Sequence, residues 1–442
     1  MKNKKSSGHD GIDNCLLKSI ILSIANPLAH IFNLSLSNGI VPTNTKIAKV
    51  IPIFKKGDTL ETNNYRPISL LPSLSKVLEK IIFKRVTSFL CANDIICESQ
   101  FGFRAKHNTT HAILTCINNI AHAIDQRLHT VGIFLDFSKA FDTINHDILL
   151  HKLEHYGVRG KALEWFRSYL SNRKQFVELD NKFSSSRPVI CGVPQGSLLG
   201  PLLFIIYIND FTKSSKTLSY ILFADDSNLF YSHSNPNHLL STINLELRNV
   251  LEWVNANKLS LNILKTNYML FSNTLRDLPG DILIDGTPLT KVSSSRFLGL
   301  TFDDKLNWKS HTLNICKTIS RNIGIMNKLK YFFPSSTLCT LYFSLVLPYL
   351  NYCIMAWGNS SQFHIDKITT LQKRALRIMH NTHIRAHTDP LFLKSKILKF
   401  SDLFYFQTGQ FMYKLKKTRT SPRLYKYVCE KQPNTQLPYK TG

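Results

Sequence analysis

Residues 220–230 read YILFADDSNLF, an apolar run interrupted by the adjacent carboxylates of Asp225 and Asp226. We expect two short strands, at residues 221–223 and 229–231, joined by a hairpin turn with both aspartates at its tip. Aspartate is common in turns, where most such pairs are simply solvated. Between strands this apolar, neighbouring carboxylates raise each other's pKa unless a cation neutralises them. The pattern therefore predicts either protonated side chains or a bound divalent metal ion.

A third carboxylate favours the metal ion. Residues 131–137 read VGIFLDF, an apolar strand that ends at Asp136 and is followed by a helical pattern. Taken alone, Asp136 is best explained as a strand-end residue that caps the following helix. Together with the hairpin pair, it forms a set of three carboxylates from two strand ends. Such a set is enough to hold two magnesium ions about 4 Å apart, the arrangement used for phosphoryl transfer.

Seven sequence blocks occur in a fixed order. They are NYRPISLL (64–71), QFGFR (100–104), LDFSKAFD (135–142), GVPQGS (192–197), FADD (223–226), KLSLNILKT (258–266) and RFLGL (296–300). In these blocks the chain resembles the reverse transcriptase of non-LTR (LINE-type) retrotransposons, nearest to the Jockey and CR1-like elements. Elements of this family usually carry an endonuclease domain ahead of the polymerase. Because the chain starts almost at the first polymerase block, we expect that domain to be missing.

The resemblance implies an α+β right-hand polymerase fold with fingers, a palm of antiparallel sheet plus helices, and a helical thumb. It also implies an RNA-directed DNA polymerase that extends a primer 3′-hydroxyl with dNTPs on an RNA template, with the element's own RNA as the expected template. Two Mg²⁺ ions are the implied cofactors. Asp136 and Asp225 would bind both ions, with Asp226 as the third carboxylate and the carbonyl of Phe137 as a further ligand. Lys265 would lie near the pyrophosphate leaving group as a proton donor, although a surface lysine is the alternative.

Further residues are expected to contact the substrates. By resemblance, Phe141 excludes a 2′-hydroxyl from the sugar pocket, but a core phenylalanine fits its position equally. Gln195 and the backbone of Gly196 would lie beside the incoming nucleotide and the templating base; an ordinary Pro-Gln-Gly turn is the alternative. The candidates for binding the triphosphate are Lys56, Arg66 and Arg104. The block RFLGL supplies an expected primer grip, formed by Phe297, Leu298 and Gly299.

Arg66 is the favoured triphosphate ligand, because a guanidinium grips phosphate oxygens bidentately and keeps its charge. Lys55 and Lys56 fit equally well as solvated lysines.

The charge of the chain points to a polyanionic partner. Its 55 Lys and Arg against 29 Asp and Glu give a net charge of +26, which favours nucleic acid. The nine cysteines include no C-x-x-C pair, which favours a reducing compartment, nucleus or cytoplasm. The basic start, residues 1–5, does not lead into an apolar segment, so we do not expect secretion. The longest apolar stretch, residues 338–357, contains Pro348 and is read as a buried helix, so no membrane contact is expected.

The helical periodicity divides the chain into three parts. We expect reverse transcriptase fingers and palm over residues 1–305, a helical thumb and connection over 306–400, and a basic tail over 401–442. One expected thumb helix carries Lys373, Arg374 and Arg377 opposite its apolar stripe, as a grip on a nucleic acid duplex requires.

Two other functions are compatible with the sequence. One is a truncated, inactive retroelement remnant that only binds nucleic acid. The other is a host polymerase of the telomerase type, which the spelling of the blocks supports less well.

Overall fold

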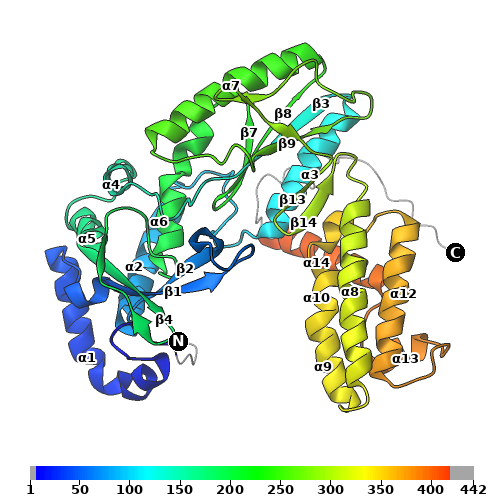
Figure 1. Ribbon diagram of the computed structural model, residues 1–442, viewed down its shortest axis with the longest axis horizontal. Helices are drawn as coiled ribbons and strands as arrows, with labels where there is room; N and C mark the ends of the chain where they lie inside the picture. Colours follow the sequence, from blue (N-terminus) through cyan, green and yellow to red (C-terminus); the bar gives the residue numbers. More distant parts are fainter. Residues whose placement is uncertain (1–5, 419–442) are drawn as a thin grey trace.

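The computed structural model describes residues 6–418 (Figure 1). Its central element is a five-stranded sheet in the order β12-β9-β3-β8-β7. All neighbours are antiparallel except β12 and β9. The strands are β3 (His129–Leu135), β7 (Ser219–Phe223), β8 (Asp226–His233), β9 (Asn267–Phe271) and β12 (Thr290–Lys291). This is the antiparallel palm sheet that the sequence predicts, and β3 ends one residue before Asp136 as expected.

Both faces of the palm sheet are covered. Val131, Ile133 and Leu135 of β3 belong to an apolar core on one face, shared with α4 (His146–His155), α6 (Leu199–Tyr207) and α7 (Pro236–Ala256). Phe134 belongs to a second core, shared with α3 (Thr109–Asp125) and the thumb. A side chain at Gly132 would meet the Phe230 ring at 2.8 Å, so the absence of a side chain there makes room for that ring.

The fingers are built on a second sheet, ordered β2-β1-β4-β5, with β6 paired to β4. Its strands are β1 (Ile47–Phe54), β2 (Tyr65–Leu70), β4 (Arg173–Leu179), β5 (Lys182–Phe183) and β6 (Arg187–Val189). The sequence pattern predicts a hairpin with strands over residues 173–179 and 183–191, and β4 matches the first strand. The second strand is split in two, because a serine run, 184–186, separates β5 from β6 and Pro188 cannot donate to the ladder. Helices α2 (Ser73–Ala92) and α5 (Lys161–Leu170) pack beside this sheet.

The first helix, α1 (Asn14–Asn38), lies on the outside of the fingers (Figure 1). Periodicity predicts an amphipathic helix packed through one apolar face, but only Leu17, Phe32 and Ser35 are buried. Ile20 and Ile31 are exposed, because periodicity reports an apolar face without reporting whether a neighbour covers it. Within residues 6–418, α1 is the one helix long and apolar enough to cross a bilayer, by length and composition only.

The thumb begins after a small hairpin and is helical, as predicted. The apolar stretch 338–357, expected as one buried helix, is divided among three short helices around Pro348. Leu338, Leu350 and Trp357 are buried, one from each helix. Residues 401–418 belong to the last helix, Phe400–Thr418, in which Phe400 and Leu415 are buried. This part of the expected tail is therefore packed against the rest of the protein. The remainder of that expected tail, 419–442, lies outside the described residues.

The thumb and connecting elements are β10 (Leu283–Ile284), β11 (Thr287–Pro288), β13 (Ser294–Phe297), β14 (Leu300–Asp303), α8 (Lys309–Leu329), α9 (Ser335–Leu345), α10 (Leu347–Asn351), α11 (Ile354–Trp357), α12 (Gln362–Met379), α13 (Asp389–Ser395) and α14 (Phe400–Thr418).

Candidate active site

The two neighbouring carboxylates lie at the tip of the β7–β8 hairpin, as predicted. The turn is tighter than expected, because Phe223 already pairs with Asp226 and leaves only Ala224 and Asp225 to reverse the chain. Ala224 has a φ of 57°, a conformation that two-residue hairpin turns demand at their first position. Asp225 is therefore the second turn residue, and Asp226 is the first residue of β8.

A buried glutamine holds this turn. Gln100 is 1% exposed, and its Oε1 accepts hydrogen bonds from the backbone N–H of Gly102 (2.8 Å) and of Ala224 (3.2 Å). The same segment pairs with β7, since the Phe101 N–H donates to the Leu222 carbonyl at 2.8 Å. A Cβ on Gly102 would lie 2.6 Å from the Ala224 nitrogen, so only glycine allows this approach. Sequence reasoning missed Gln100, although it begins the block QFGFR.

A cleft of about 750 Å³ lies beside the turn and brings half of the predicted residues together. Those that line it are Arg66, Asp136, Phe137, Phe141, Gln195, Asp225 and Lys265. Those that do not are Lys56, Arg104, Gly196, Asp226, Phe297, Leu298 and Gly299. The structure corrects one candidate: Lys55, not Lys56, lines the cleft. Asp226 remains electrostatically coupled to the site through Asp225 and Asp136.

The surroundings of the turn raise the pKa values of its two carboxylates. Solvent reaches both side chains, but the protein around them removes enough water to disfavour their charged forms. Burial raises the pKa of Asp225, and Asp136 raises it further, while Lys55 and Arg66 oppose the shift. Burial, Asp225 and Asp136 raise the pKa of Asp226 to about 6. A cluster of carboxylate oxygens whose charges repel one another is the donor set that a hard divalent cation such as Mg²⁺ prefers.

Lys265 faces the same carboxylate cluster. Its Nζ lies 3.8 Å from Oδ2 of Asp136, with both side chains substantially exposed. Asn262 and Thr266 fix the strand end nearby: the Asn262 N–H donates to the Asp136 carbonyl at 2.7 Å, and the Asp136 N–H donates to Thr266 Oγ1 at 3.2 Å. The block KLSLNILKT thus anchors Asp136 as well as presenting Lys265 to the cleft.

Gln195 is oriented by a carboxylate that sequence reasoning left without a role. Its Nε2 donates to both oxygens of Asp142, at 2.9 and 3.1 Å. Its backbone carbonyl accepts a hydrogen bond from the Ser69 N–H of β2 at 2.7 Å. Asp142 was visible in the sequence, as the last residue of LDFSKAFD, but nothing local pairs it with a residue 53 positions away.

The two glycines of the Gln195 loop, Gly192 and Gly196, allow close packing within the protein. Gly196 has a φ of 131°, and a Cβ there would lie 2.4 Å from the Ser69 carbonyl oxygen. A Cβ on Gly192 would lie 2.6 Å from the Asp142 carbonyl oxygen. These positions need glycine because the loop lies directly on β2 and on the LDFSKAFD segment.

The start of α6 is fixed from two sides. Ser197 Oγ accepts from the Gly200 N–H at 2.8 Å, as the side chain of a helix N-cap does. The buried Glu79 of α2 accepts from the Leu198 N–H and from the Tyr169 hydroxyl, both at 2.8 Å. The fingers helix α2 is thereby tied to the loop that carries Gln195.

The two phenylalanines of the LDFSKAFD block both contact the core. Phe141 stacks on Phe204 with ring centroids 4.6 Å apart and also lines the cleft, so its ring is both a core residue and a pocket wall. Phe137 is buried against Phe211 at 5.9 Å, which leaves its backbone as the part suited to a metal ligand.

Two further groups of predicted residues contact the protein itself. The Arg104 guanidinium donates to the carbonyls of Cys97 (2.9 Å) and Gln100 (3.2 Å), so it braces the segment that holds the Ala224–Asp225 turn. Phe297 is a core residue packed near Phe134, and the Tyr352 hydroxyl of the thumb donates to the Leu298 carbonyl at 2.6 Å. The expected primer grip thus forms a hairpin tip that is joined to the thumb.

Comparison with known proteins agrees with this site. The family model for reverse transcriptase (RNA-dependent DNA polymerase) matches residues 53–302. The "Probable RNA-directed DNA polymerase from transposon BS" and the RNA-directed DNA polymerase from mobile element jockey, both from Drosophila melanogaster, are 31% and 30% identical to this chain. Each match spans 85% of this chain and 42% of the relative.

Among solved structures, apo telomerase from Candida tropicalis is similar with a TM-score of 0.44 at 12% identity, over 81% of this chain and 63% of that one. The family model covers more than half of the sequence and includes the whole palm sheet. The chain therefore belongs to the reverse transcriptase family, and within it resembles the Jockey-type non-LTR retrotransposons, as its sequence blocks predict.

Proposed function

We propose that this chain is an RNA-directed DNA polymerase that extends a primer 3′-hydroxyl with dNTPs on an RNA template. The observation that carries the proposal is the convergence of Asp136, Asp225 and Lys265 on one cleft, with Arg66 and Gln195 in its walls. Membership of the reverse transcriptase family supports the same activity. The matched relatives are about twice as long as the matched segment, so the activity is proposed for this chain on its own residues.

The residues at the cleft fit two Mg²⁺ ions, the proposed cofactors. Asp136, Asp225 and Asp226, with the carbonyl of Phe137, would hold the ions, which supply charge neutralisation for the attacking and leaving oxygens. The raised pKa values of Asp225 and Asp226 support this fit, since both carboxylates are poised to exchange a proton for a cation.

The other cleft residues position the substrates. Arg66 and Lys55 would bind the triphosphate, because both lie near enough to Asp225 to lower its pKa. Gln195, held by Asp142, would contact the base pair being formed, and the Phe141 ring would lie under the sugar. Lys265 would hold a proton at its Nζ for the pyrophosphate oxygen that leaves.

The proposed partners are an RNA template, a DNA primer and dNTPs. The basic composition supports nucleic acid, since each phosphate contact releases counterions and weakens with salt. A nuclear or cytoplasmic location is proposed as well, supported by eight cysteines in the described residues that are all free thiols.

The test is primer extension on poly(rA) with an oligo(dT) primer, dTTP and Mg²⁺. We expect extension by the parent chain and none by Asp225→Asn, which removes one metal-binding oxygen. The matched control is Asp277→Asn, an exposed aspartate that pairs with Lys291 at 2.6 Å and lies outside the cleft lining. Equal extension by parent and Asp225→Asn would refute the assignment. Salt-sensitive RNA binding without extension by any form would favour the inactive remnant.

A further inference from the structure

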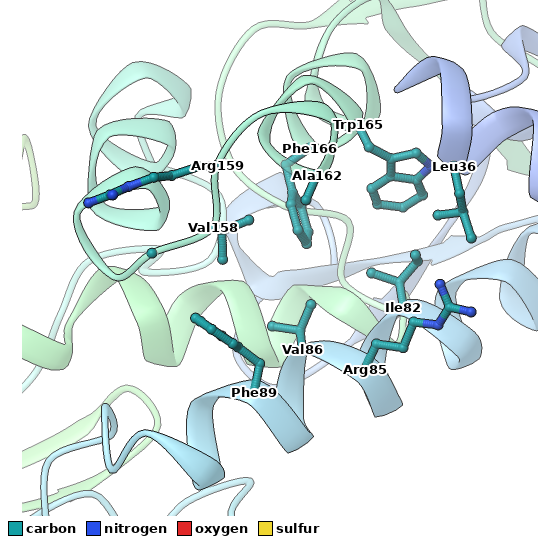
Figure 2. A pocket seen from close by; sticks show the side chains of 11 residues that line it. Leu36, Ile82, Arg85, Val86, Phe89, Val158, Arg159, Ala162, Trp165 and Phe166 are labelled. Atoms are coloured by element: carbon teal, nitrogen blue, oxygen red, sulfur yellow. The ribbon is translucent and has the colours of Figure 1, made fainter.

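A second cavity, of about 360 Å³, lies on the outer side of the fingers between α1, α2 and α5 (Figure 2). Leu36 of α1, Val86 and Phe89 of α2, and Trp165 and Phe166 of α5 line it. It shares no lining residue with the catalytic cleft. The cavity is therefore independent of the site proposed for polymerisation.

The interior of this cavity is apolar. Ile82, Trp165 and Phe166 are almost fully buried beneath it. The Trp165 Nε1–H already donates to Ser35 Oγ at 3.1 Å, and its indole stacks on Tyr169. A water molecule there would find few hydrogen-bond partners, because such a molecule needs two to four. Large apolar side chains are the groups that such a space accepts.

The rim of the cavity is cationic. Figure 2 shows Arg85 and Arg159 at opposite ends of the row of apolar side chains. Both are exposed, and neither forms an ion pair within residues 6–418. The helices around the cavity carry two acidic residues: Glu79 is buried against Tyr169, and Glu164 of α5 pairs with Lys161 at 2.7 Å. Within residues 6–418, the two arginines of the rim are therefore not paired with a carboxylate.

We propose that this cavity docks an acidic amphipathic helix of a partner protein. A leucine, phenylalanine or tryptophan of that helix fills the space above Trp165, and aspartate or glutamate side chains on either side pair with Arg85 and Arg159. Charge complementarity favours an acidic partner, and the apolar floor selects a helix with large apolar side chains over nucleic acid, whose phosphates find no polar partner there. A bilayer is a weaker fit, because its flat surface cannot reach apolar groups recessed between three helices.

The test selects peptides of about 16 residues, a little over four helical turns, from a random display library on the purified full chain. Binders retained by the Arg85→Glu/Arg159→Glu double variant are discarded. We expect enriched peptides to carry large apolar residues at i and i+3 or i+4, flanked by Asp or Glu. In fluorescence anisotropy, their Kd should rise about tenfold or more with Val86→Glu, a cavity variant that has no part in the selection.

The matched control is Lys213→Glu/Lys216→Glu, which reverses two exposed charges outside the cavity and should leave the Kd unchanged. Thermal melting checks that every variant is folded. The proposal is overturned if no acidic, apolar motif is enriched, or if the Kd does not respond to the cavity variants. A second result also overturns it: oligonucleotides or phosphatidylglycerol vesicles bind the parent chain and lose that binding in the cavity variants, whereas the selected peptides bind the parent and the cavity variants equally.

Discussion

Replacing Gln100 with leucine removes the acceptor that holds the catalytic turn. The backbone N–H groups of Gly102 and Ala224 both donate to Gln100 Oε1, at 2.8 and 3.2 Å, in a fully buried position. Leucine has nearly the same volume but accepts no hydrogen bond. Both donors are then left buried without a partner, unless the turn moves to find one.

The expected loss of folding stability follows from those two donors. Each unpaired buried N–H costs about 1–3 kcal/mol, so the loss of both hydrogen bonds in Gln100→Leu should destabilise the fold by about 2–6 kcal/mol. The larger effect falls on catalysis, because Asp225 follows Ala224 directly. A shift of the turn by about 1 Å is enough to lower kcat about 100-fold. The Mg²⁺ concentration for half-maximal rate should rise as well, since Asp225 and Asp226 move away from Asp136.

Asn209→Leu is the matched control for this prediction. Asn209 is also buried and makes two hydrogen bonds to the same segment, with the N–H of Cys97 and the carbonyl of Ile95, both at 2.8 Å. It does not contact the turn. Primer extension and urea unfolding of both variants distinguish an effect on the position of the turn from a general loss of folding stability. If Asn209→Leu lowers kcat as much as Gln100→Leu at equal loss of stability, Gln100 has only a structural role and the argument fails.

Three other predictions concern the same cleft. The pKa of Asp226 is raised to about 6, so its charged form, which is proposed to bind the cation, is lost as pH falls through 6. The half-saturating Mg²⁺ concentration should therefore rise about tenfold from pH 7.5 to pH 5, and titrations of primer extension that show no change would contradict this. Phe141→Val should raise ribonucleotide incorporation relative to deoxynucleotide by about 100-fold in competition assays, whereas a ring with only a core role would change stability alone. Lys265→Met should lower kcat about 100-fold with little change in the KM for dTTP; a change in KM alone would assign Lys265 to binding.

The sequence predicts the local features of the site well. The strand that ends before Asp136, the hairpin that carries Asp225 and Asp226, and β4 are all found where the pattern places them. These features depend on residue order over a few positions, where alternation and turn composition are informative.

The contacts that hold the site together could not be predicted in the same way. Gln100 reaches Ala224 across 124 positions, and Gln195 reaches Asp142 across 53. Neither pair carries a local pattern, because each is created when separate elements pack. The same limit explains α1: its apolar periodicity was correct, but its exposure depends on neighbours that periodicity does not encode.

The order of strands in the palm sheet has a consequence for synthesis of the protein. The β3 strand lies between β8 and β9, so the strand that leads to Asp136 gains its second neighbour only when residues up to 271 are available. Pairing over such sequence separations is slow, because the loop must close before the contacts form. A nascent chain that has passed Asp136 but not β9 therefore exposes an apolar strand edge on the ribosome. The carboxylates of Asp136, Asp225 and Asp226 come together late in translation, after most of the fingers have already emerged.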